Sequence, residues 1–150
     1  MPHGKGECKY ADRSRYDGQW RDGQPNGEGT KSNFDGSKYT GEWLNGEATG
    51  QGVKTHSNKC IFTGTWLRNE IIKGECEYPN GSKYDGEWKE GKPNGVGMMH
   101  WPSESKTYEG EFFQGKPIGR GVKTSPKGSK YHGYWAGGKF FEGQPPENEL

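Results

Sequence analysis

Large aromatic side chains recur along the chain in pairs four residues apart, with a glycine midway between the members of each pair. Residues two apart in an extended chain point to the same face, so Tyr16-Gly18-Trp20 predicts a β-strand with both rings on one side. The motif begins at residues 16, 39, 62, 84, 108 and 131, and this regular return predicts a repeat architecture. Its copies are Tyr16-Gly18-Trp20, Tyr39-Gly41-Trp43, Phe62-Gly64-Trp66, Tyr84-Gly86-Trp88, Tyr108-Gly110-Phe112 and Tyr131-Gly133 with Trp135.

A glycine-rich segment of the form G-x-x-x-G-x-G follows four of the six copies. Glycine weakens a strand interior, but a large ring lying across it shields its backbone and recovers part of that cost. We therefore predict that these glycines are sockets for the aromatic rings of neighbouring strands. They are Gly23, Gly27 and Gly29; Gly46, Gly50 and Gly52; Gly91, Gly95 and Gly97; and Gly115, Gly119 and Gly121.

A second period covers three of these repeats. The string GECKYADRSRYDG at 6–18 returns as GECEYPNGSKYDG at 74–86, and GVKT at 52–55 returns at 121–124. The array is therefore interpreted as a duplicated block of three repeats. Because the chain begins within a repeat, we expect it to be part of a longer array or of a larger protein.

The connections between repeats set the register of the sheet. If every ring is to face the same side, the loop into the next repeat must contain an odd number of residues, and three residues ending in a left-handed glycine are favoured. The segments 34–36, 79–81 and 126–128 fit this form. The resulting register predicts that Gly27 lies between Trp20 and Trp43, Gly29 between Gly18 and Gly41, and Lys31 between Tyr16 and Tyr39.

These elements predict an all-β fold. We expect an elongated single-layer antiparallel β-meander of successive hairpins, curved and twisted because open sheets of about a dozen strands curl. One face carries the rings, with Lys31, Lys54, Met99 and Lys123 between them. The other face is interpreted as a solvated lattice of cross-strand charge pairs, or as a charge stripe for a partner. Its charged residues are Arg15, Lys38, Lys83, Lys130, Asp17, Asp85, Glu42, Glu87 and Glu111.

Composition changes this picture little. Only 26% of the 150 residues are hydrophobic and the mean hydropathy is −1.26, which alone would favour disorder, but aromatic residues make up 13% and favour order. The net charge of +1 argues against a nucleic-acid binder. No apolar run approaches the roughly 18 residues of a membrane span, and the N-terminus carries no signal-peptide core. We expect a cytoplasmic protein, with membrane association as the alternative, whose three cysteines are reduced thiols.

The sequence offers no motif for catalysis. The G-x-G elements do not predict a nucleotide site, because each leads into another strand and a phosphate-binding loop needs a helix N-terminus behind it. The four histidines lie far apart and lack ligand spacing, and no nucleophile motif occurs. We therefore predict a protein that is not an enzyme and that holds no cofactor and no metal.

The full pattern Y-x-G-x-W-x-x-G-x-x-x-G-x-G followed by D/N-G resembles the MORN repeat, over residues 4–143. The third and sixth copies depart from it. The third has Asn69 or Lys73 where glycine is expected, and the sixth has Glu142 there. The resemblance implies one domain over 1–150, with a partial repeat at 4–15, repeats starting near 16, 39, 62, 84, 108 and 131, and a tail at 144–150. It also implies an antiparallel sheet of hairpins used as an interaction and assembly module, commonly with dimerisation.

Three functions stay open at this point: a protein-binding scaffold, a phospholipid-binding module, and a regulatory or spacer domain of a larger enzyme. An uncovered apolar strip on a single-layer sheet favours the first, with a protein or peptide partner held along the aromatic groove. The apolar pair Phe140-Phe141 near the C-terminal edge, followed by Pro145-Pro146, predicts self-association there, as in a homodimer. The candidate partner-binding residues are Tyr16, Trp20, Tyr39, Trp43, Trp66, Tyr84, Trp88, Tyr108, Phe112, Tyr131, Trp135, Lys31, Lys54 and Lys123.

Overall fold

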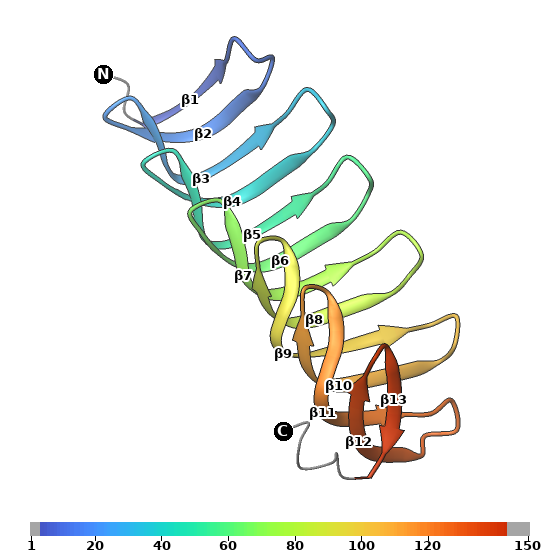
Figure 1. Ribbon diagram of the computed structural model, residues 1–150. Coiled ribbons are helices and arrows are strands. Elements are labelled where there is room, and N and C mark those ends of the chain that lie inside the picture. Colours follow the sequence, from blue (N-terminus) through green and yellow to red (C-terminus); the bar gives the residue numbers. More distant parts are fainter. Residues whose placement is uncertain (1–3, 144–150) are drawn as a thin grey trace. The chain divides into compact units, whose positions relative to one another are not determined.

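The computed structural model describes residues 4–143, and these residues form antiparallel strands and no helix. The described residues divide into two compact units, one up to Pro79 and the other from Asn80 onward. Within each unit every strand pairs with its neighbours in the sequence, as expected of a meander of hairpins (Figure 1). The all-β prediction is therefore confirmed.

The first unit contains seven strands. Strands of the same hairpin are joined by two-residue turns, and consecutive hairpins are joined by longer loops at the opposite end of the strands (Figure 1). The strands are β1 (Gly4–Lys9), β2 (Arg15–Arg21), β3 (Gln24–Ser32), β4 (Lys38–Leu44), β5 (Glu47–Thr55), β6 (Ile61–Leu67) and β7 (Glu70–Glu77).

The second unit contains six strands in the same arrangement. Its third hairpin ends in a short strand of four residues. The strands are β8 (Lys83–Lys89), β9 (Lys92–Trp101), β10 (Lys106–Phe113), β11 (Lys116–Thr124), β12 (Lys130–Ala136) and β13 (Lys139–Glu142).

The loop between β3 and β4 has the predicted three-residue form. The N–H of Gly36 donates to the carbonyl of Asn33 at 3.0 Å, and the N–H of Asn33 donates to the carbonyl of Ser37 at 2.9 Å. Gly36 has a φ of 90°, a left-handed conformation that glycine adopts without steric cost. Arg13 and Lys59 take the same conformation in the equivalent loops, with φ of 69° and 76°.

The predicted register is confirmed in its central part. Lys31 pairs with Tyr16 on one side and with Tyr39 on the other, and Gly29 pairs with Gly18 and Gly41. Gly27 lies opposite Trp43 as predicted, but its predicted pairing with Trp20 is wrong.

A β-bulge after Gly18 causes this difference: it shifts the register by two residues, so that Trp20 lies opposite Pro25 instead of Gly27. At the bulge Gly27 has a φ of 90°, and the space that its missing side chain leaves is filled by the side chain of Gln19, not by an aromatic ring. The Gln19 side-chain oxygen accepts a hydrogen bond from the N–H of Glu28 at 2.7 Å. The middle glycine of the motif therefore forms a bulge and is not a socket for a ring.

In later repeats a carboxylate accepts the hydrogen bond from the backbone N–H at the equivalent bulge. Glu42 accepts from the N–H of Gln51, and Glu87 accepts from the N–H of Val96 at 2.7 Å. These side chains were predicted to belong to a lattice of cross-strand charge pairs, and that part of the prediction is wrong because they bind backbone N–H groups instead. The register also places Lys38 opposite Ser32 and Thr55, which carry no charge.

The third and sixth copies are built differently. In the third, the strands shift by one residue only, between Thr65 and Trp66, so that Trp66 lies opposite Ile71. In the sixth, β12 and β13 pair without a shift from Gly133 to Ala136. Each three-repeat block therefore contains two bulged hairpins and one hairpin that lacks the two-residue bulge.

The core consists of the aromatic rings themselves. Tyr16 lies over Gly29, so that a side chain at Gly29 would overlap the Tyr16 hydroxyl and ring. The third glycine of each motif is thus a socket, as predicted. The same contact joins Tyr39 to Gly52, Tyr84 to Gly97, and Tyr108 to Gly121.

Candidate functional site: the aromatic face

The rings of the first unit form a continuous edge-to-face ladder. Tyr16 lies between Trp20 and Trp43, with ring centroids 5.0 Å and 5.3 Å away, and Tyr39 lies between Trp43 and Trp66 at 5.1 Å and 5.3 Å. Interplanar angles of 80° to 88° match the T-shaped geometry that aromatic pairs prefer. Each tyrosine therefore joins one hairpin to the next.

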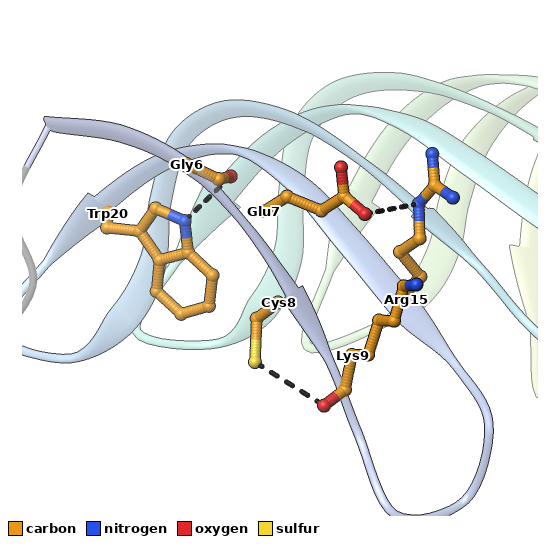
Figure 2. Close-up of polar contacts among 6 residues, drawn as sticks. All are labelled: Gly6, Glu7, Cys8, Lys9, Arg15 and Trp20. Carbon is orange, nitrogen blue, oxygen red and sulfur yellow. Dashed lines mark hydrogen bonds and ion pairs between the residues drawn. The ribbon is translucent and has the colours of Figure 1, made fainter.

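The polar atoms of these rings bind the backbone. The indole N–H groups of Trp20, Trp43 and Trp66 donate to the carbonyls of Gly6, Gly29 and Gly52, each at 3.0 Å. Figure 2 shows the first of these bonds, with the Cys8 thiol on the same side of the hairpin and the Glu7–Arg15 ion pair on the other. Indole N–H groups used in this way cannot bind a partner, so the tryptophans offer only ring surface.

The tyrosine hydroxyls are held in a similar way. The Tyr16 hydroxyl donates to the carbonyl of Gln19 at 2.9 Å, and the Tyr84 hydroxyl donates to the carbonyl of Glu87 at 2.8 Å. Burial raises the pKa of both phenols to about 12, and it does the same for Tyr39 and Tyr108. These four tyrosines are therefore neutral donors under ordinary conditions.

The second unit has an equivalent ladder with two differences. Tyr84 contacts Trp88 and Phe112, and Tyr108 contacts Phe112 and Trp135. Phe112 stands where the other hairpins have tryptophan and has no N–H to donate. The indole N–H of Trp135 is buried and has no hydrogen-bond partner within residues 4–143.

Lysines and aromatic rings alternate along the middle of the aromatic face in the first unit. In strand order the row runs Tyr16, Lys31, Tyr39, Lys54 and Phe62, each directly opposite the next. Both lysines are half-buried. The row therefore places two ammonium groups among aromatic rings on the same face.

A hollow of about 190 Å³ lies on this face. Three of the predicted rings, Tyr39, Trp43 and Trp66, line it together with both lysines. Sequence reasoning missed the remaining lining residues, although Asn69 was noted as a departure from glycine. They are Asn33, Gly46, Ala48 and Asn69.

Asn69 has a structural reason to replace glycine. Its φ of 69° lies in the left-handed region, which asparagine tolerates better than most residues. Its side-chain oxygen accepts a hydrogen bond from the N–H of Ala48 at 2.8 Å, and its own N–H donates to the carbonyl of Ala48 at 3.1 Å. The turn of the third hairpin is therefore tied to the second hairpin at the edge of the hollow.

The row in the second unit contains a single lysine. In strand order it runs Tyr84, Met99, Tyr108, Lys123 and Tyr131. Met99 is buried at the position that corresponds to Lys31. The central row is therefore less basic in this unit.

A hollow of about 320 Å³ surrounds Lys123 and Tyr131. Here Phe140 lies against Gly133, and Tyr131 is 37% exposed whereas the other motif tyrosines are almost fully buried. The Lys123 ammonium lies 5.5 Å from the centre of the Phe140 ring, within cation–π range. Lys106, Ser125 and Glu142 complete the lining.

The predicted site residues thus fall into two groups. Most of the rings, including Tyr16, Trp88, Tyr108 and Phe112, are buried within the sheet and hold it together. The three lysines and Tyr131 are more accessible, and so are the terminal rings of the two ladders, Trp20 and Trp135. The predicted binding role of these residues remains a prediction.

The C-terminal edge was predicted to mediate self-association. Phe141 is 45% exposed and stacks on Tyr134 at 5.4 Å, while Phe140 is turned toward Lys123. Pro145-Pro146 and the rest of the tail at 144–150 lie outside the described residues. Self-association remains a prediction.

Residues 4–143 offer little other chemistry. This part of the chain has no group of three His, Cys, Asp or Glu side chains that could hold a metal ion. It has no helix long and apolar enough to cross a membrane. Cys8, Cys60 and Cys76 are free thiols, and burial raises the pKa of Cys76 to about 12.

Comparison with protein-family models decides the family. The model of the MORN repeat matches residues 1–15, 16–38, 39–61, 84–106 and 108–130, which together make up more than half of the chain. The chain belongs to the MORN-repeat family. The hairpins that this model leaves out, near 62–83 and from 131 onward, are the two that lack the two-residue bulge.

Two further comparisons were made with the MORN-repeat chain. The search of the curated proteins found no match. Among solved structures, the chain is similar to the SAS-4 (dCPAP) TCP domain in complex with a Proline Rich Motif of Ana2 (dSTIL) of Drosophila melanogaster, with a TM-score of 0.41 and 16% sequence identity. That alignment covers 92% of this chain and 88% of the other.

Proposed function

We propose that this MORN-repeat chain is a non-enzymatic interaction scaffold that binds a segment of another protein along its aromatic face. The observation that carries the proposal is the hollow that Lys31 and Lys54 line together with the rings of Tyr39, Trp43 and Trp66. Aromatic floors give contact area at low entropic cost, and charged groups beside them set which partner is accepted.

The chemistry of the hollow favours an acidic protein segment. Lysine ammonium groups donate hydrogen bonds to carboxylates, and methylene groups of a partner pack on ring surface. The tryptophan and tyrosine polar atoms are already bound to backbone carbonyls, and the side chains of Asn33 and Asn69 hydrogen-bond Ser37 and Ala48. The two lysines are therefore the main groups of the hollow that remain to bind polar atoms of a partner.

A phospholipid headgroup is the competing ligand, since it also presents an anion to lysines. The net charge of +1 disfavours a lipid surface, because the binding of anionic membranes depends on many positive charges acting together. Lipid binding is therefore an outcome to be tested.

The experiment is a selection of randomised peptides displayed on phage, carried out on the whole chain. It is repeated on the double variant Lys31→Gln/Lys54→Gln and on a control, Lys9→Gln/Lys38→Gln, which removes the same charge from the opposite face of the same unit. We expect acidic peptides to be enriched on the wild type and on the control, and to be lost from the first variant.

Co-sedimentation with vesicles of phosphatidylcholine containing phosphatidylserine, across a range of salt concentrations, completes the test. Circular dichroism checks that all variants fold. Equal enrichment on both double variants would overturn the proposal. Vesicle binding that disappears with salt and with Lys31→Gln/Lys54→Gln, in the absence of peptide enrichment, would replace it with the lipid function.

A further inference from the structure

The backbone positions of the two lysines of the hollow are separated by a distance that the sheet fixes. Lys31 on β3 and Lys54 on β5 both lie directly opposite Tyr39 on β4, so their backbones are two strand spacings apart. Neighbouring strands lie about 4.8 Å apart, which gives about 9.6 Å between the two attachment points. The direction between them is perpendicular to the strands.

An extended peptide matches this distance at one spacing only. A polyproline II chain rises about 3.1 Å per residue and a β-strand about 3.3 Å, so residues three apart are separated by about 9.3 to 9.9 Å. In the polyproline II form these residues also point the same way, because the helix has about three residues per turn. Residues one or two apart span about 3 to 7 Å, so the flexible lysine side chains would have to lean toward each other to bind both carboxylates.

The neighbouring acidic groups leave the lysines available. Asp12 and Asp35 lie near Lys31 and Lys54, but the Asp12 carboxylate accepts hydrogen bonds from Ser14 and the Asp35 carboxylate accepts one from the N–H of Ser37 at 2.8 Å. Within residues 4–143 neither lysine forms an ion pair. Lys31 instead lies 5.6 Å from the centre of the exposed Tyr10 ring.

We infer that the aromatic face of the first unit recognises an extended acidic segment whose carboxylates stand three residues apart, lying across β3, β4 and β5. This inference rests on the proposed function and adds the spacing and direction of the partner. One carboxylate binds Lys31 and the other binds Lys54, while the residues between them pack on Tyr39. In the second unit Met99 replaces the first lysine, so that unit does not offer the pair.

The test uses labelled synthetic peptides and fluorescence anisotropy with the whole chain. Three peptides consist of serine, proline and two glutamates, and they differ only in whether the glutamates are one, two or three residues apart. A fourth peptide carries two glutamines in place of the glutamates. Because the first three have the same charge, non-specific attraction is equal among them. We expect the three-residue spacing to bind about threefold to fivefold more tightly than the others.

Three sets of variants locate the effect. Lys31→Gln and Lys54→Gln should each abolish the preference for spacing, Lys31→Arg and Lys54→Arg should keep it, and Lys38→Gln should leave it unchanged. If the three spacings bind equally while Lys31→Gln and Lys54→Gln weaken all of them, the inferred spacing is wrong and the proposed function stands. If no glutamate peptide binds better than the glutamine peptide, the acidic segment is wrong as well.

Discussion

At the scale of single residues, the contact between Gly29 and Tyr16 holds the sheet together. The glycine has an ordinary φ. A methyl group in place of its hydrogen would overlap the hydroxyl and ring of Tyr16. Replacing Gly29 with alanine must therefore displace a fully buried side chain, at a cost of about 2 kcal/mol. Urea unfolding measures this loss.

Gly6 supplies the matched control. It lies in β1 opposite Gly18, and a methyl group there would meet the Trp20 indole at 3.6 Å, an ordinary van der Waals distance. Gly6→Ala should change the free energy of unfolding by less than about 0.5 kcal/mol. Equal effects of the two substitutions would show that the Tyr16 ring does not limit the size of the side chain at position 29.

The buried tyrosines make the fold sensitive to alkali. The pKa of Tyr16, Tyr39, Tyr84 and Tyr108 is raised by burial from 10.0 to about 12, so the unfolded chain loses these protons before the folded chain does. Their contribution to stability is complete below pH 10 and is lost as the pH rises from 10 to 12. Between these two pH values, each tyrosine lowers the free energy of unfolding by up to about 1.4 kcal/mol per pH unit.

Urea unfolding at a series of pH values from 9 to 11.5 measures this dependence, and absorbance at 295 nm reports phenolate formation. The four phenols should ionise together with unfolding. Ionisation of all tyrosines near pH 10 in a chain that stays folded would contradict the burial of these rings.

At the scale of the hairpin, the bulge depends on one acceptor. Glu42 accepts from the N–H of Gln51, and Gln19 does the same for Glu28 in the preceding hairpin. Glu42→Ala leaves the amide of the bulge without this partner and should cost about 1 to 2 kcal/mol. Glu42→Gln reproduces the natural arrangement of the first hairpin and should stay within about 0.5 kcal/mol of the wild type.

Urea unfolding of these two variants is compared with Glu75→Ala, which removes an exposed carboxylate opposite Thr63 on a strand without the two-residue bulge. We expect that control to be nearly neutral. If Glu42→Gln is as destabilising as Glu42→Ala, the side chain acts through its charge and not as a hydrogen-bond acceptor.

Much of this hairpin could be predicted from the sequence. The alternation of rings and glycine gave the strands, and the odd loops gave the central register, because both follow from the two-residue period of a strand. The bulge was missed because every glycine of the motif was predicted to be a socket for a ring. A signal was present: Gln19, Glu42, Glu87 and Glu111 precede the second ring in the bulged hairpins, whereas Thr65 and Tyr134 stand there in the other two.

The candidate site was less predictable. The motif identifies the rings, but their depth of burial depends on the ladder that joins adjacent hairpins, and this ladder has no signature in any one repeat. Lys31 and Lys54 could be placed on the face by parity alone. Asn33 and Ala48 reach the hollow from positions at which the repeats differ, so no period indicates them.

At the scale of the whole molecule, repeats of equal length can be removed as units. Residues 16–38 and 39–61 each form one 23-residue repeat, so deletion of 39–61 brings β6 next to β3 in an unchanged register. Since repeat proteins are stabilised by contacts between neighbours, the shortened chain should fold with lower stability and a smaller urea m-value. Near-UV circular dichroism should still report ordered rings.

The same deletion tests the site, because it removes Lys54 and leaves Lys31 between Tyr16 and Phe62. Peptides with glutamates three residues apart should then bind no better than those with adjacent glutamates. The control deletes residues 39–50, which breaks the repeat within β5 and leaves Tyr16 without its edge-to-face partner Trp43. Loss of near-UV signal in the control but not in the 23-residue deletion is the expected result, since only the longer deletion preserves the seating of each ring over the glycine of its neighbour. Equal loss in both would mean that the unit depends on contacts beyond adjacent hairpins.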